Sequence, residues 1–163
     1  IYLEIFGGGY GAGPRNDGVD GVDSPLSNCA NIPVEATDMD HSFFRCVDYS
    51  FVTGSGGRGR RRGGLAFRKD YEILENGVTF ATYGDRFKIA ADGIFGGEPG
   101  SKACNQVIRG EDIIDLPSKC QFTLKKGDRL IIQTAAGGGY GPRQERPNAL
   151  IARDSEDGLM AAE

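Results

Sequence analysis

The stretch GLAFRKDYEILENGVTFAT, residues 64–82, contains two runs of aliphatic, aromatic and β-branched residues on either side of an Asn-Gly pair. Such runs favour strands. Asn76-Gly77 is a typical two-residue turn, because a type I′ turn needs a positive φ at both of its central positions. The stretch therefore predicts a β-hairpin formed by residues 64–74 and 78–82.

The same pattern continues on both sides of this stretch. Further strand-like runs lie at residues 1–6, 43–53, 104–108, 121–124 and 129–134, with Gly-containing turns between them. Lys126-Gly127-Asp128 joins two of these runs in the same way as Asn76-Gly77. We expect at least six strands in an all-β fold, mainly an antiparallel sandwich or barrel.

Helix signals are scarce before Pro147. This proline can begin a short helix that Ala149, Leu150, Ile151 and Ala152 continue and that Asp157-Gly158 interrupts. The sequence thus predicts a β-rich domain over residues 1–146 and a short helical tail over residues 147–163.

Charge and composition narrow the classes of partner. The 163 residues carry a net charge of −4, which argues against nucleic acid as the main partner. No apolar run approaches the roughly 18 residues of a membrane span, and we expect a cytoplasmic protein without a membrane partner. Its four cysteines lie far apart in sequence, at Cys29, Cys46, Cys104 and Cys120. With one histidine, His41, expected at the surface, they predict free thiols and no metal site.

The sequence GGGYG occurs twice, at residues 7–11 and 137–141. A phosphate cradle needs a helix after its glycine-rich turn, whereas each copy is followed by a proline. We interpret both copies as tight structural bends, with ligand contact as the alternative; the residues concerned are Gly8, Gly9, Tyr10, Gly138, Gly139 and Tyr140. At least one of these four glycines is expected to have a positive φ.

A further glycine motif, GSGGRG at residues 54–59, formally matches the dinucleotide-binding pattern G-x-G-x-x-G. Gly63-Gly64 follow where that pattern requires a helix, so a nucleotide role is disfavoured. Within the arginine cluster of residues 58–62, Arg58, Arg60 and Arg62 are candidate contacts for an anion or a partner. The alternatives are a solvated turn and an RNA-binding arginine-glycine segment.

Two acidic features complete the candidate residues. Asp85-Arg86 is interpreted as an internal salt bridge, with a binding role as the alternative. The aspartates Asp17, Asp20 and Asp23 suggest calcium, but their spacing differs from that of an EF-hand, and the closing glutamate is absent.

The order of motifs carries a resemblance to a known family. FGGGYGAGPRNDGVDGV, SNCANIPVE, GSGGRGRRRGGLAFRKDYEIL, GDRF, IFGGEPG and LPSKCQFTLKKGDRLIIQTAAGGGYGPRQERP follow one another along the chain. This ordered set resembles the C-terminal part of the hydantoinase B/oxoprolinase family, the B-type subunits of ATP-dependent hydantoinases, oxoprolinases and related ketone carboxylases. Where family members usually begin a regular last helix with an acidic residue, this chain has Arg146, so we expect a weak helix there.

The resemblance implies an ATP-dependent hydrolase of cyclic amides, or alternatively an acetone- or acetophenone-type carboxylase. It also implies that ATP and a divalent metal bind in an A-type partner subunit or in a region outside this chain, which itself holds no cofactor. We therefore expect a hetero-oligomer with an A-type subunit or the N-terminal part of the same protein, and an isolated piece without activity. A non-catalytic β-rich assembly module is the hypothesis from a different class.

Overall fold

The structure, a computed structural model, describes residues 1–23 and 32–160. The strands are β1 (Phe44–Phe51), β2 (Phe67–Ile73), β3 (Val78–Tyr83), β4 (Cys104–Arg109), β5 (Asp112–Leu116), β6 (Lys119–Leu124) and β7 (Arg129–Gln133). The helices are α1 (Val34–Asp40) and α2 (Asn148–Glu156), with a 3₁₀ turn at Arg143–Glu145.

The strands form two antiparallel sheets, which confirms the all-β prediction with a short C-terminal helix. Five strands pair in the order β1-β2-β7-β4-β5, and β3 pairs with β6 in a second, smaller sheet. Helix α1 is the exception to an otherwise strand-rich chain before Pro147, and the sequence did not predict it. Neither helix within the described ranges is long and apolar enough to cross a bilayer.

The hydrophobic core lies between the two sheets. Apolar side chains of β1, β2, β4, β5, β6 and β7 meet there, and Val107 and Leu124 are almost completely buried. The fully buried members of the core are Phe44, Tyr71, Ile73, Val107, Leu116, Leu124 and Leu130. Burial alternates along β3: Val78, Phe80 and Thr82 are half-buried, and the residues between them are exposed. This alternation follows because one face of β3 points to the core between the sheets and the other points outward.

Both predicted hairpins are wrong in the same way. Asn76-Gly77 connects β2 to β3, and Lys126–Asp128 connect β6 to β7, but each turn links two different sheets. Gly77 and Gly127 do have positive φ values, 78° and 88°. Both turns were located correctly, but Asn76 has no positive φ, so the Asn76-Gly77 turn is not the expected type I′ turn. Strand pairing was decided by the burial of the side chains on the two layers. A two-residue hairpin loop forms instead at Gly110-Glu111, between β4 and β5.

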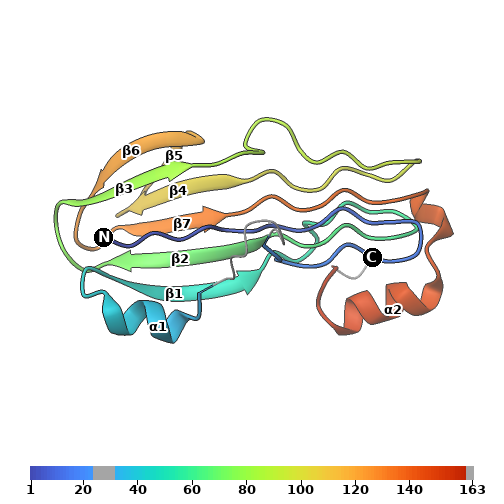
Figure 1. The fold of residues 1–163 in the computed structure, drawn as a ribbon, viewed down its shortest axis with the longest axis horizontal. Coiled ribbons are helices and arrows are strands. Elements are labelled where there is room, and N and C mark those ends of the chain that lie inside the picture. Colours follow the sequence, from blue (N-terminus) through green and yellow to red (C-terminus); the bar gives the residue numbers. More distant parts are fainter. Residues whose placement is uncertain (24–31, 161–163) are drawn as a thin grey trace.

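Residues 1–6 were predicted to form a strand, but they run as an extended segment outside both sheets. In the view of Figure 1 this segment runs lengthwise between β7 and β2. Its side chains alternate, since Ile1, Leu3 and Ile5 are exposed while Tyr2 and Phe6 pack against the core.

The half of the molecule away from the strands is built from extended segments without regular strand pairing (Figure 1). We call this region the glycine bundle; it comprises residues 7–22, 54–66, 91–100 and 134–142. The last of these segments is central, because it is hydrogen-bonded to each of the others. Ala12 N donates to Gly138 O at 2.9 Å, Gly57 N to Gly137 O at 2.9 Å, and Ile94 N to Gly139 O at 3.0 Å.

Glycine is required in this bundle by close approach between backbones. A Cβ on Gly9 would lie 2.0 Å from Gly64 O, and one on Gly137 would lie 1.9 Å from Tyr10 O. The same physical reason places glycine at the crowded axis of collagen. The expectation of positive φ was wrong: none of Gly8, Gly9, Gly138 and Gly139 has one.

The C-terminal helix is well anchored, contrary to the expectation of a weak helix after Arg146. The Arg146 guanidinium donates to Asp154 in α2 at 3.0 Å and to Asp17 in the glycine bundle at 2.9 Å. Beyond α2, Gly54 N donates to Leu159 O at 2.9 Å. These contacts cross the predicted boundary between residues 146 and 147, and the division into two domains stays a prediction.

Candidate functional site

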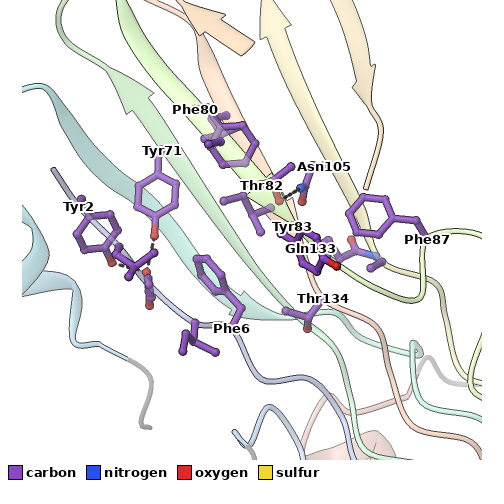
Figure 2. Close-up of a pocket in the computed structure, with 18 of the residues that line it drawn as sticks. Tyr2, Phe6, Tyr71, Phe80, Thr82, Tyr83, Phe87, Asn105, Gln133 and Thr134 are labelled. Atoms are coloured by element: carbon purple, nitrogen blue, oxygen red, sulfur yellow. Dashed lines mark hydrogen bonds between the residues drawn. The ribbon is translucent and has the colours of Figure 1, made fainter. Parts of the chain in front are cut away.

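An apolar groove of about 1420 Å³ lies in the sandwich half of the molecule (Figure 2). Its floor is the core face of the five-stranded sheet, including Tyr71, Leu130 and Ile132. One wall is the 1–6 segment, and the other is the continuous chain from Glu75 to Phe87, which contains β3. Phe6 and Phe80 lie on opposite walls of this groove (Figure 2).

A buried charged cluster closes one part of the groove. Glu4 forms an ion pair with Lys69, and both side chains are only 1% exposed. Glu4 also accepts a hydrogen bond from Tyr2 and one from Tyr71 at 3.1 Å. The Lys69 ammonium lies 4.2 Å from the centre of the Tyr49 ring, which adds a cation–π contact.

Both tyrosines of this cluster are held in the protonated form. Burial, together with the hydrogen bond to Glu4, raises the pKa of Tyr2 to about 12. Burial and the nearby Glu4 charge also raise the pKa of Tyr71 above its usual value. Glu4 accepts from Tyr2, Lys69 and Tyr71, and the cluster thereby fixes the 1–6 segment to β2.

Amide and hydroxyl groups gather at the other part of the groove, near the end of β3. Asn105 Nδ2 donates to Thr82 Oγ1 at 3.2 Å, and Gln133 and Thr134 lie nearby (Figure 2). Asp85 and Arg86 also line the groove. The predicted salt bridge between them does not form among the described residues, and Arg86 instead donates to Ala90 O at 3.2 Å.

The arginine cluster divides into a buried and a half-buried part. Arg62 is 4% exposed and donates to Asp20 Oδ1 at 2.8 Å and to Gly63 O at 2.8 Å. Asp154 lies 3.8 Å from Arg62 Nε. Arg62 is therefore paired with acidic groups of its own chain, and its contact with an anion or a partner stays a prediction.

Arg58 and Arg60 are half-buried in the glycine bundle. The Arg60 guanidinium lies 5.7 Å from the centre of the Tyr140 ring. Tyr140 in turn packs against Phe95, with 5.3 Å between ring centres. Phe95 is 76% exposed and has a positive φ of 53°, so these aromatic and cationic side chains mark one surface of the bundle.

The two GGGYG copies lie side by side in the bundle, although they are far apart in sequence. Gly137 N donates to Gly64 O at 2.9 Å, and Gly64 N donates to Tyr10 O at 2.8 Å. Tyr10 anchors its segment through a hydrogen bond from its hydroxyl to Asp23 O at 3.0 Å. Gly56, Gly57 and Gly59 of the GSGGRG motif pack into the same bundle, where no helix follows them.

The remaining candidate residues are the acidic residues near the N-terminus and the cysteines. Asp17 forms an ion pair with Arg146 and Asp20 forms one with Arg62, and the described residues contain no group of side chains suited to a metal ion. Cys46, Cys104 and Cys120 are free; Cys29 lies outside the described residues.

His41 was expected at the surface, but it is half-buried in an aromatic cluster. Its ring lies 4.9 Å from that of Tyr2 and 5.5 Å from that of Phe44, measured between ring centres.

Sequence reasoning missed the groove and its charged cluster. The available signals were Glu4 within an otherwise aliphatic and aromatic run, and Lys69 in phase with the buried residues Phe67 and Tyr71 of β2. A charged residue at a buried strand position requires a buried partner.

The arrangement of these motifs is that of a known family, whose model, Hydantoinase B/oxoprolinase, matches residues 1–143. The chain belongs to the hydantoinase B/oxoprolinase family. It is 36% identical over 156 residues to an uncharacterized protein of Methanocaldococcus jannaschii, covering 96% of this chain and 27% of that protein. It is 28% identical to the B component of a putative D-/L-hydantoinase of a Pseudomonas species, covering 100% of this chain and 28% of that component.

Two solved structures share the fold of this hydantoinase B/oxoprolinase chain. The ATP-dependent caprolactamase from Pseudomonas jessenii has a TM-score of 0.72 at 27% identity, with 94% of this chain and 28% of that chain covered. Nucleotide-free acetone carboxylase has a TM-score of 0.80 at 16% identity, with 94% and 25% covered. The chain thus spans about a quarter of the length of these proteins.

Proposed function

We propose that this chain is the C-terminal part of the B-type subunit of an ATP-dependent cyclic-amide hydrolase. The observation that carries the proposal is the family match over residues 1–143, together with relatives named for the hydrolysis of cyclic amides, namely hydantoinase, 5-oxoprolinase and caprolactamase. In this reaction ATP transfers a phosphoryl group to the amide oxygen and leaves as ADP. Water then attacks the activated ring carbon, phosphate leaves, and the ring C–N bond breaks.

In this proposal the chain supports an active site that other parts of the assembly complete. ATP and a divalent metal bind in an A-type subunit or in a region outside residues 1–163, and the assembly is a cytoplasmic hetero-oligomer. Two relatives are themselves named as single subunits, one of a hydantoinase and one of a caprolactamase, which supports a partner subunit. The isolated 163-residue piece is then inactive.

The side chains proposed to meet the neighbouring part of the enzyme are Arg58, Arg60, Asp85 and Arg86. Asp85 and Arg86 line the groove, and Arg60 lies on the aromatic surface around Tyr140. A guanidinium in this setting suits a carboxylate of a partner.

The test is to purify the full-length B-type chain with its A-type partner and to measure ATP hydrolysis with added substrates. We expect ATP hydrolysis to rise with a cyclic amide such as hydantoin, 5-oxoproline or caprolactam, and the ring to open in step. Stimulation by acetone or acetophenone with bicarbonate would instead establish the carboxylase alternative. Activity that persists after deletion of residues 1–163 would establish a non-catalytic assembly module.

A further inference from the structure

The small sheet has an unpaired edge that faces the groove. Gly84 N donates to Ser118 O at 2.7 Å, which fixes the phase of the ladder between β3 and β6. Because hydrogen-bonding direction alternates along a strand, Phe80 and Thr82 direct their backbone groups to β6. Thr79, Ala81 and Tyr83 direct theirs away from β6. Among the described residues, β3 pairs with no strand other than β6, and no backbone group of a turn or loop accepts from these three amides.

This open edge runs along the groove itself. All residues of β3 line the groove, including Thr79, Ala81 and Tyr83, whose side chains are exposed. The opposite wall is the 1–6 segment, which is likewise extended. Between the two walls lies the core face of β2 and β7, where Ile132 is half-buried and Ile73 and Leu130 are buried.

The geometry selects the chemistry of the occupant. A strand edge offers amides and carbonyls to another extended backbone, and the apolar floor accepts every second side chain of such a strand. The charged cluster of Glu4 and Lys69 is internally paired, so this part of the groove requires no charged partner group. An extended segment with alternating apolar residues satisfies the edge and the floor together.

We propose that a segment of the longer family chain, outside residues 1–163, adds to the free edge of β3 and fills the groove as an additional strand of the small sheet. A segment of the same chain is favoured because two relatives are much longer than this chain. Their matches cover 96% and 100% of this chain but only 27% and 28% of the relatives themselves. The sandwich is then completed within one B-type chain. The inference rests on family membership and is independent of which reaction the enzyme catalyses.

Residue-resolved amide hydrogen exchange on the full-length B-type chain tests this proposal. We expect the amides of Thr79, Ala81 and Tyr83 to exchange at least about a hundredfold more slowly than unstructured amides, as the amides of Phe80 and Thr82 do. This protection must not change on tenfold dilution. Rapid exchange at the three positions, with Phe80 and Thr82 protected, would overturn the proposal. Protection that disappears on dilution would show a second copy on the edge and would also overturn it.

A proline variant identifies the added segment. Ala81→Pro removes the N–H that faces the groove, while the exposed side-chain position tolerates the ring. In the full-length variant we expect faster exchange at Thr79 and Tyr83 and in one segment outside residues 1–163. Unchanged exchange everywhere beyond residues 78–83 would contradict the proposal. The hydrogen-exchange measurement on the wild-type chain tests the proposal by itself, so the test remains even if the Ala81→Pro variant fails to fold.

Discussion

At the scale of single residues, the five-residue cluster of Asp17, Asp20, Arg62, Arg146 and Asp154 joins the glycine bundle to the C-terminal helix. Its carboxylates each accept from at least one guanidinium. Arg62 and Arg146 are both under a tenth exposed in their side chains. Breaking one member of such a buried network leaves an uncompensated charge.

We therefore predict that Arg62→Ala lowers the free energy of unfolding by about 3–5 kcal/mol. Arg60→Ala is the matched control, because Arg60 is half-buried and contacts the Tyr140 ring rather than a buried carboxylate. It should cost about 1 kcal/mol or less. Urea unfolding of both variants measures the difference. Equal stability of the two variants would show that the cluster does not support the fold.

The same cluster predicts acid sensitivity. Burial alone would raise the pKa of Asp17, but hydrogen bonds from Arg146 and from the Arg62 amide outweigh it and lower this pKa below 3.8. Stability from Asp17 is therefore complete above pH 3.8 and is lost as the pH falls through the lower folded value. Between about pH 5 and pH 3, Asp17→Asn should lose less stability than the parent protein in urea unfolding. An equal loss in both proteins would contradict this role of Asp17.

The glycines of the bundle give a second prediction at this scale. In Gly9→Ala the new Cβ would meet Gly64 O at 2.0 Å, whereas in Gly13→Ala it would meet no atom within 4 Å. Neither glycine has a positive φ. Gly9→Ala should destabilise the fold by about 3 kcal/mol or more, and Gly13→Ala should be neutral or slightly stabilising. Similar thermal midpoints for the two variants would refute the close-approach explanation.

At the scale of elements, the strands show where sequence reasoning worked and where it failed. The runs at 104–108 and 129–134 became β4 and β7 nearly unchanged, because their apolar residues match the pleat of a half-buried sheet. Both turns were recognised from glycine, but neither paired its neighbours. A turn can be recognised from a few neighbouring residues, whereas the choice of which strands pair depends on contacts between residues distant in sequence. β5 was missed because its five residues follow β4 after only two residues.

The interface between the two sheets gives a prediction for these elements. Leu124 of β6 is 1% exposed and packs in the core, so Leu124→Ala should destabilise the protein by about 2–5 kcal/mol. Ile113→Ala in β5 is the control, since Ile113 is 66% exposed. Its expected effect is within about 0.5 kcal/mol. Denaturant midpoints compare the two; a mild effect at Leu124 would mean that β6 is not held against the larger sheet.

At the scale of the whole molecule, the sequence predicted the fold class and the family, but not the division into a sandwich and a glycine bundle. The glycines beside Tyr10 and Tyr140 were recognised as structural, but for the wrong reason. A positive φ was expected from the local sequence, whereas glycine is required there by the close approach of backbone segments distant in sequence. The groove could not be predicted because its walls, β3 and the 1–6 segment, are separated in sequence by β1 and β2.

The redox state is a property of the entire chain. Cys46, Cys104 and Cys120 are free in the structure, and we predict that all four cysteines are thiols in the native protein. Denaturation without reductant, followed by alkylation, should add one label for each cysteine by mass. A stable species that lacks two of these labels would contradict the prediction.

The central position of residues 134–142 in the glycine bundle has a kinetic consequence. These residues continue directly from β7, and residues 54–66 lead directly into β2. Glycine segments lose the most chain entropy when they become ordered and have few apolar side chains to drive collapse. The sheet must therefore form first and hold the segments in register, so that the bundle closes late in folding. Each backbone hydrogen bond of the bundle then depends on a nucleus of Phe, Tyr and Leu side chains that lies in the other half of the protein.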